Sequence, residues 1–369
     1  MTTPTPPATP QTPQREQLKP PVARVKALGW VRANLFNSWF NSLVTVAVVW
    51  VLWGVVPPFV RWAFVDSLWN STGAECREAA GACWSIVPAN IRFILFGFYP
   101  QPEQWRPAVA MALLVGLLLY SRNRKYWKKS LGYAWLVGLV VMGVLMRGGV
   151  LGLEGVETSL WSGLPLTMLL AVFGMVAAYP LGVMLALGRR SRMPAIKSLC
   201  VVYIEMIRGV PLISLLFMSS VMFPLFLPEG LTINKILRAQ VAIILFTAAY
   251  IAEVVRGGLQ AMPRGQYEAA ESLGLRYSQA MRLVILPQAL KIVIPPSVGI
   301  LISAFKDTSL VVIIALYDIL KTTQSALSNP NWMGFSREAY IFIALIYFVC
   351  CYAMSNYSRR LERELHHGH

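Results

Sequence analysis

The stretch Gly265–Gln288, GQYEAAESLGLRYSQAMRLVILPQ, is polar and lies between two strongly apolar segments. AQVAIILFTAAYIAEVV at 239–255 precedes it, ALKIVIPPSVGILISAF at 289–305 follows it, and both are apolar enough to lie in lipid. A helix is expected to begin after residues 262–265, MPRG, with acidic residues in its first turns, where they complement the helix dipole. Gly274 interrupts this helix, and a second one is expected before Pro287.

The first of these helices carries a small, flat apolar face. Ala269, Ala270 and Leu273 share it at helical spacing, and Glu268 and Glu271 lie near its start. A helix lying on the membrane surface is one interpretation, but such helices bury Trp, Phe and Leu. The small residues and the Gly bend instead favour docking in a groove of another protein.

The composition is that of a membrane protein. Of 369 residues, 56% are hydrophobic and 14% are charged, with a mean hydropathy of +0.55; about a quarter of a soluble domain is charged. A membrane-spanning helix needs about 20 apolar residues. We therefore predict an all-α polytopic membrane protein with about eight spans: 39–60, 107–120, 131–146, 164–187, 201–227, 239–256, 288–305 and 339–357.

The net charge of +16 is read by position, as a report of sidedness rather than of nucleic-acid binding. One set of segments (1–38, 121–130, 188–198, 256–287 and 358–369) carries 21 Lys and Arg, whereas the opposite set (61–106, 147–161, 228–238 and 316–338) carries nine. Because Lys and Arg accumulate on the cytoplasmic side, both termini and the stretch Gly265–Gln288 are expected in the cytoplasm.

Two acid–base doublets lie near the ends of spans. Glu205 with Arg208, and Glu253 with Arg256, are spaced i, i+3 and can each close on one helix face. They either make charge tolerable near the interface or contribute to a cytoplasmic gate between subunits. Residues 208–211, RGVP, also break helical regularity at Pro211, as is tolerated where backbone lines a cavity or meets protein.

FKDTSLVV at 305–312 places charged and hydroxyl groups close to the end of a span. Intramembrane ionisable residues are costly and usually face an aqueous path. Lys306, Asp307, Thr308 and Ser309 are therefore candidates for a translocation path, with a single interfacial ion pair as the alternative. The following VVIIALYDIL at 311–320 is too short to span and is expected to re-enter or to pack as a half-helix.

Cysteine and histidine placement argues against a metal site. Cys76 and Cys83 lie in one polar loop, C-x6-C, without a nearby histidine. If that loop is exported, they can form a local disulfide or remain free thiols. The three histidines, His366, His367 and His369, lie in the last four residues.

Nucleotide-binding and hydrolase motifs are missing from the sequence. There is no G-x-x-x-x-G-K-[ST] phosphate loop, no G-x-S-x-G and no H-E-x-x-H. The chain is thus not expected to hydrolyse ATP, to be an enzyme or to bind a cofactor.

Residues 268–287 carry a family resemblance. Glu268-Ala269-Ala270, Gly274 and residues 284–287, VILP, match the pattern EAA-x3-G-x9-I-x-L-P with one departure, Val284 for Ile. This pattern is that of the coupling loop of ATP-binding-cassette (ABC) importer permeases. With residues 205–212, EMIRGVPL, and FKDTSL, the chain resembles the histidine, glutamine and general L-amino-acid permeases from about Gly163 onward.

The resemblance implies a type I importer core of five helices preceded by three more. It divides the chain into a tail (1–38), an extension (39–160) with a long periplasmic loop (61–106), a permease core (161–358) with a coupling loop (259–287), and a second tail (359–369). It also implies a bacterial inner-membrane location and the following partners: two cytoplasmic ATPases, which bind ATP and Mg; a second, homologous permease or a second copy; a periplasmic amino-acid-binding protein; and the amino acid.

By this resemblance, six residues belong to the ATPase contact or its frame: Glu268, Ala269, Ala270, Leu273, Gly274 and Pro287. Gly274→Asp is then expected to uncouple transport, by adding a buried charge, while leaving insertion intact. For substrate contact, Lys306, Asp307, Thr308 and Ser309 come first, and Glu253 and Arg256 second. The rival interpretation is a secondary transporter or channel that works alone and leaves the Gly265–Gln288 stretch without an ATPase partner.

Overall fold

The computed structural model describes residues 27–150 and 152–366, which are helical apart from turns, loops and two isolated β-bridges. The chain divides into two compact units, Met1–Asp66 and Ser67–His369, and each is described by itself. The predicted boundary between an extension and a core at 160/161 stays a prediction.

The first unit holds α1 (Ala27–Leu35) and α2 (Trp39–Val60), which continues as a π-helical turn, Arg61–Val65. Ser38 starts α2 by accepting a hydrogen bond from the Phe40 amide. The segment Trp39–Val65 is long and apolar enough to cross a membrane.

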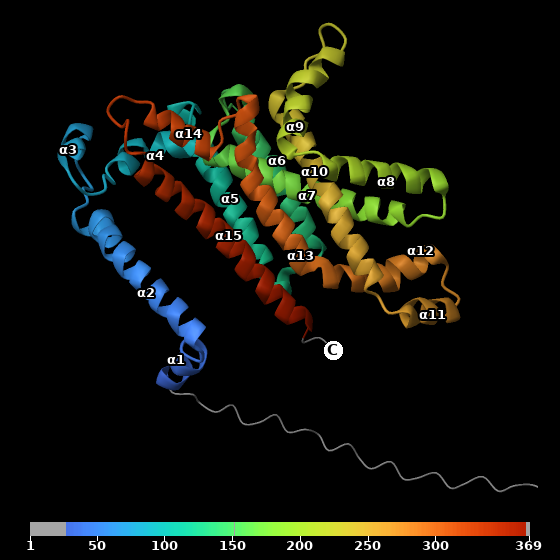
Figure 1. Ribbon diagram of the computed structural model, residues 1–369. Coiled ribbons are helices and arrows are strands. Elements are labelled where there is room, and N and C mark those ends of the chain that lie inside the picture. Colours follow the sequence, from blue (N-terminus) through green and yellow to red (C-terminus); the bar gives the residue numbers. More distant parts are fainter. Residues whose placement is uncertain (1–26, 151, 367–369) are drawn as a thin grey trace, which may run out of the picture. The chain divides into compact units, whose positions relative to one another are not determined.

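The second unit is built mainly from long helices (Figure 1). These are α5 (Trp105–Ser121), α6 (Lys129–Arg147), α7 (Gly163–Arg189), α10 (Lys235–Gln260), α13 (Leu286–Asp307) and α15 (Ser336–His366). Across the described residues, seven helices are long and apolar enough to span a membrane, or eight if one bent pair counts as a span. The prediction of a helical polytopic protein with about eight spans is confirmed.

The bent pair corrects the predicted span over 201–227. The structure has α8 (Pro194–Gly209) and α9 (Leu212–Phe217), which continues as helical turns to Phe226, and the directions of Pro194–Gly209 and Leu212–Phe226 differ by 104°. Proline forces the residue before it into an extended conformation, and Val210 accordingly has φ −113° and ψ 134°. The break expected at Pro211 is therefore present, and it makes this region a broken span or a re-entrant loop rather than one continuous helix.

The centre of the second unit is the contact between α7 and α10. Gly182 lies against Ile251 so closely that an added Cβ would come within 2.6 Å of the isoleucine side chain. Small residues at helix interfaces allow such close approach. Around this contact, α8 and α13 complete a buried cluster that includes Ile204, Val255 and Val293.

Short helices close one end of this unit, which we call the disulfide end (residues 67–104 and 315–338). They are α3 (Gly73–Glu78), α4 (Ile86–Phe96) and α14 (Ile319–Leu327). Cys76 and Cys83 form a disulfide, which resolves the alternatives left open by the sequence. The Glu338 carboxylate accepts a hydrogen bond from the Cys83 amide at 3.1 Å.

The segment 311–320 neither spans nor re-enters as one helix. A 3-10 segment, Thr308–Ile314, extends the end of α13, and Ala315 then turns the chain with φ 53°. Asp318 caps α14 by accepting a hydrogen bond from the Lys321 amide at 2.9 Å. The expected half-helix is thus two short pieces with a turn between them.

The opposite end, which we call the α11 end (residues 188–197 and 257–288), carries α11 (Arg264–Ser272) and α12 (Tyr277–Ala280). Figure 1 shows both helices together at one side of the bundle. The second helix was expected to stop before Pro287, but helix runs on from Tyr277 to Ile314. Because proline cannot donate a backbone hydrogen bond, the helix widens into a π-helical turn at Met281–Ile285 just before it.

Candidate functional site

Gly274 ends α11 by adopting a left-handed backbone conformation. Its φ is +71°, and an added Cβ would meet nothing within 4 Å. Its amide donates to the Glu271 carbonyl at 2.8 Å, and the Leu275 amide donates to the Ala270 carbonyl at 3.2 Å. This is the glycine-terminated helix end that satisfies otherwise unpaired carbonyls. Gly274 is exposed in the isolated chain, so a charge placed there is buried only where a partner covers α11, and the expectation for Gly274→Asp stays a prediction.

The outer face of α11 differs from the predicted one. Glu268 and Ala269 are exposed, and Leu273 is 77% exposed. Ala270 is only 1% exposed and faces the protein's own interior. Ala269 and Leu273 are spaced i, i+4 and share a helix face, and Glu268 is exposed at its edge. The available surface is therefore Glu268–Ala269–Leu273, whereas Ala270, one residue further on, faces the interior.

Tyr267 ties α11 to the end of α7. Its hydroxyl donates to the Leu259 carbonyl at 3.2 Å and accepts from Arg190 Nη1 at 3.1 Å. The Arg190 guanidinium also lies over the tyrosine ring, 5.7 Å from its centroid, and donates to the Leu259 carbonyl. Three segments thus meet at one phenol.

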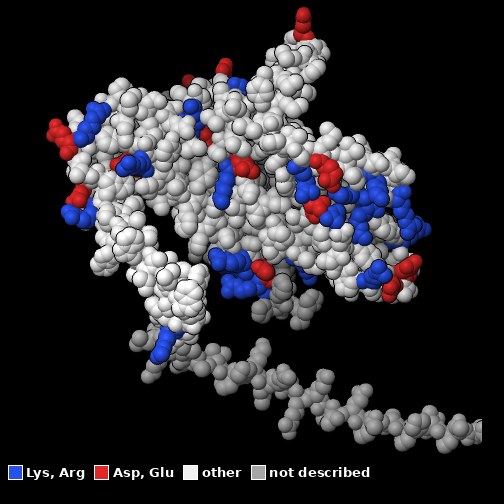
Figure 2. All heavy atoms as spheres, viewed as in Figure 1, with Lys and Arg blue, Asp and Glu red and all other residues white. Residues whose placement is uncertain are grey.

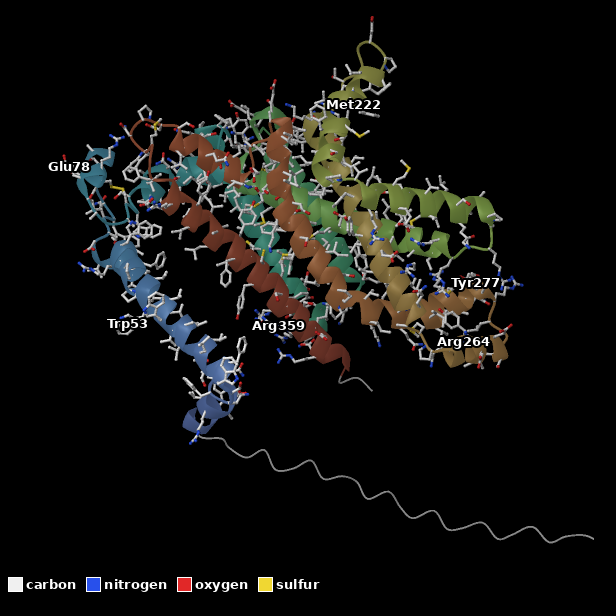
Figure 3. All side chains as sticks on the ribbon, in the orientation of Figure 1. Trp53, Glu78, Met222, Arg264, Tyr277 and Arg359 are labelled. Atoms are coloured by element: carbon white, nitrogen blue, oxygen red, sulfur yellow. A yellow bond between two sulfur atoms is a disulfide. The ribbon has the colours of Figure 1, made fainter. Side chains whose placement is uncertain are left out.

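Gln266 and Gln288 tie the same helix to α13. Gln288 Nε2 donates to Gln266 Oε1 at 2.9 Å and to the Val284 carbonyl at 3.0 Å. Together with the Tyr267 contacts, these bonds connect α11 to two long helices. A displacement of α11 therefore acts directly on the ends of α7 and α13. Arg264 and Tyr277, labelled in Figure 3, mark the starts of α11 and α12.

Glu253 is the centre of an ionic cluster on α7, α8 and α10. Its carboxylate pairs with Arg256 on the same helix, with Arg189 at 3.4 Å and with Arg208 at 3.7 Å. The predicted Glu253–Arg256 pair is confirmed. The predicted Glu205–Arg208 pair is wrong, because Glu205 pairs with Arg189 at 2.9 Å instead. The sharp turn at Pro211 reorients α8 and brings Arg208 to α10. Lys and Arg gather in this region (Figure 2).

A cavity of about 390 Å3 lies between α9, α10 and α13. Its walls are mostly apolar, and its polar groups come from two of the helices: Thr247, Tyr250, Ser303 and Asp307. A mostly apolar pocket with a few convergent polar groups is the usual form of a small-molecule site. Sequence reasoning found Asp307 but missed the others, although a lone Thr or Ser in an apolar span is a signal that could have found them.

Tyr250 connects this cavity to the ionic cluster. The Arg208 guanidinium lies 5.5 Å from the centroid of its ring, and Arg208 is also a partner of Glu253. Glu253 and Arg256, the second-choice substrate residues, belong to the cluster and do not line the cavity. If Arg208 changes its ion-pair partner, its contact with Tyr250 changes, and Tyr250 is part of the cavity wall.

The other residues predicted for the pathway have local roles. The buried Thr308 hydroxyl donates to the Phe305 carbonyl at 2.7 Å, and the Ser309 hydroxyl donates to the Lys306 carbonyl at 2.9 Å. Neither residue lines the cavity, nor does Lys306, which is exposed. Of the predicted run, Asp307 alone faces this space.

The long apolar helices, the connected α11 and the mostly apolar cavity with a few convergent polar groups point to a membrane transport protein. Residues 178–367 match the model of the family described as "binding-protein-dependent transport system inner membrane component". The chain belongs to this family. It is therefore an inner-membrane transport component rather than an enzyme.

Relatives agree over nearly the whole chain. The inner membrane amino-acid ABC transporter permease protein YhdY of Escherichia coli K12 is 50% identical over 93% of this chain and 94% of its own. The glutamate/glutamine/aspartate/asparagine transport system permease protein BztC of Rhodobacter capsulatus is 38% identical, covering 95% and 96%. A solved amino acid ABC transporter with histidines is 33% identical over 55% of this chain and 92% of its own, with a TM-score of 0.49.

Proposed function

We propose that the chain is the permease subunit of an ATP-driven importer of amino acids. The observation that carries this proposal is α11, which offers the exposed Glu268–Ala269–Leu273 face on one side and is tied to α7 and α13 on the other. Such a helix is suited to receive a movement from another protein. The amino-acid specificity is supported by the names of the two full-length relatives.

In this proposal, partner proteins supply ATP binding, delivery of the amino acid and the second half of the channel. Two cytoplasmic ATPases bind ATP and Mg and dock on α11, so the chain itself holds no cofactor. A periplasmic binding protein delivers the amino acid, and a second permease, homologous or identical, completes the channel. Both termini lie in the cytoplasm, as the distribution of Lys and Arg indicates.

The cavity beside Asp307 is the proposed amino-acid site. The Asp307 carboxylate can pair with the ammonium group, and the hydroxyls of Thr247 and Ser303 can serve the carboxylate. The Glu253 cluster would act as a gate, because Tyr250 joins it to the cavity.

Reconstitution tests the proposal as a whole. The chain is placed in proteoliposomes with its binding protein, partner permease and ATPase, and uptake of labelled amino acids is measured. Uptake that requires ATP and the ATPase is expected. Uptake by the chain alone without ATP would instead support a secondary transporter or channel.

Asp307→Asn tests the cavity. Losing the ion pair with the ammonium group is expected to lower uptake at least about tenfold, since a charged hydrogen bond contributes about 1.5–3 kcal/mol. Ser309→Ala, two residues beyond Asp307 and outside the cavity lining, is the control and is expected to leave uptake within about twofold. Equal uptake in both variants would remove Asp307 from the site.

A further inference from the structure

A second cavity lies away from α11, where the ends of α5 and α6 approach the last turns of α15. Its volume is about 760 Å3, within the range of roughly 300–1,000 Å3 that is usual for ligand pockets. Its walls combine side chains of three membrane-spanning helices with those of the loop between α5 and α6. Figure 3 labels Arg359 beside it on α15.

Three guanidinium groups line this cavity: Arg122 from the end of α5, and Arg360 and Arg363 from α15. Arg360 and Arg363 are spaced i, i+3 and therefore share one face of α15. A smaller adjoining cavity, of about 420 Å3, is also lined by Arg122 and Arg360. Blue side chains gather at this end of the bundle in Figure 2.

The acidic residues nearby leave the cavity positively charged. Glu364 pairs with Arg360 through Nε at 2.8 Å, which uses one of the five N–H donors of that guanidinium. Within the described part of the chain, Arg122 has no ion-pair partner. Neither Glu364 nor Glu362 lines the cavity.

The aromatic part of the wall is fixed by hydrogen bonds. Trp127 Nε1 donates to the Ser121 carbonyl, and Trp135 Nε1 donates to the Ser121 hydroxyl, both at 2.8 Å. Two indoles from different elements are thus held by one serine. Tryptophan favours the depth of lipid headgroups, where its ring lies in apolar surroundings and its N–H in polar ones.

The apolar part of the wall continues into the membrane-spanning region. Leu118 and Leu119 come from the last turns of α5, Leu131 from α6, and Tyr352 from α15. The cavity therefore has cations at the ends of the spans and apolar surface along them. A molecule that fills it needs an anionic group joined to hydrocarbon chains.

We propose that this cavity binds an anionic phospholipid, with the phosphate between Arg122, Arg360 and Arg363 and the acyl chains along Leu118 and Leu131. Basic pockets between spans are known to hold acidic headgroups. The lipid would bridge the α5–α6 pair and α15. Few backbone contacts connect either α5 or α6 to α15.

Native mass spectrometry of the full-length chain in mild detergent tests this assignment. Phosphatidylglycerol, phosphatidylcholine, or glycerol 3-phosphate is titrated in separately. Saturable retention of one phosphatidylglycerol is expected, at least about tenfold tighter than that of phosphatidylcholine. Equal retention of both lipids would overturn the proposal. Binding of glycerol 3-phosphate as tight as that of phosphatidylglycerol would also overturn it, since the site would then recognise a soluble phosphate.

Three variants locate the site. The triple variant R122Q/R360Q/R363Q is expected to lose at least about tenfold in phosphatidylglycerol affinity. K125Q/K128Q/K129Q removes three charges from the same end but none from the lining, and it is expected to bind like the wild type. Ala353→Trp keeps every charge but fills the cavity, and it is also expected to abolish retention. Equal loss in the Lys and Arg variants, or unchanged binding by Ala353→Trp, would contradict the site.

Discussion

The two ends of the second unit are held together in different ways. At the disulfide end, a covalent bond joins Cys76 to Cys83, and two side chains bond to backbone groups far away in sequence: the Cys83 amide donates to the Glu338 carboxylate, and the Thr322 hydroxyl donates to the Ile94 carbonyl at 2.8 Å. At the α11 end, the helix is connected by the side chains of Tyr267 and Gln266. One end is cross-linked covalently, whereas the α11 end is held by noncovalent contacts alone, and we expect α11 to be the part that moves.

This difference separates stability from coupling. Changes at the disulfide end are expected to lower the free energy of unfolding without altering how much amino acid is moved per ATP. Changes at the α11 end are expected to lower the amount of amino acid moved per ATP, with a smaller loss in the free energy of unfolding. Each of the following predictions uses a full-length variant with both measurements.

The largest expected effect is the pH dependence at Asp318. Burial raises the pKa of its carboxyl to about 6 from 3.8. The folded state therefore binds this proton more tightly than the unfolded state, so stability is greatest below about pH 4 and falls as the pH rises through 6. The loss is about 3 kcal/mol, at about 1.4 kcal/mol per pKa unit.

Asp318→Asn tests this effect, because asparagine can still cap α14 but does not titrate. Thermal unfolding in detergent is compared at pH 4, 5, 6 and 7. The variant is expected to gain stability relative to the wild type as the pH rises. A difference that stays constant with pH would show that Asp318 does not titrate in this range.

Replacing both cysteines, C76S/C83S, is expected to cost about 2.5 kcal/mol. This follows from the entropy of closing a short loop, given a sequence separation of 7 residues. The ratio of transport to ATP hydrolysis should remain within about twofold of the wild type. Cys200→Ser changes a free cysteine and serves as the control. A lower ratio of transport to ATP hydrolysis in C76S/C83S would show that the disulfide end also affects coupling, which would contradict the proposed difference between the two ends.

Gly274→Ala has a smaller effect on stability but a specific one on coupling. A side chain in the left-handed region costs about 1–2 kcal/mol, and Gly274 has φ +71°. Transport per ATP is expected to fall about fivefold, while the free energy of unfolding falls by no more than this strain of about 1–2 kcal/mol. Gly265→Ala is the matched control, since Gly265 is equally open but lacks the positive φ. Similar losses in both variants would show that the backbone conformation is not what matters.

Local patterns predicted the helical class, the break at Pro211 and the two helices around Gly274. In each case the cause lies within a few residues: an apolar run, a proline or a glycine. The i, i+3 pair of Glu253 and Arg256 was found in the same way. Such features depend on chain geometry alone.

Features that depend on distant partners were missed. Arg208 lies at the right spacing to pair with Glu205, but the ion-pair partner of Glu205 is Arg189 from α7. Ala270 resembles Ala269 in sequence, but the packing of α11 against the bundle buries it. The cavity polar groups, Thr247 and Ser303, come from two helices whose contact no local pattern records.

The central claim is that an ATPase contacts the Glu268–Ala269–Leu273 face of α11. Ala269→Cys and Ala270→Cys place a thiol at neighbouring positions of this helix, of which Ala269 is exposed and Ala270 is buried against the chain's own interior. Disulfide cross-linking to a cysteine introduced into the docking groove of the ATPase is measured in the assembled complex after an oxidant is added, with the unmodified chain as the background for its own free cysteines. The account predicts cross-linking from Ala269→Cys and none from Ala270→Cys. Cross-linking from Ala270→Cys alone, or from neither variant, would contradict it.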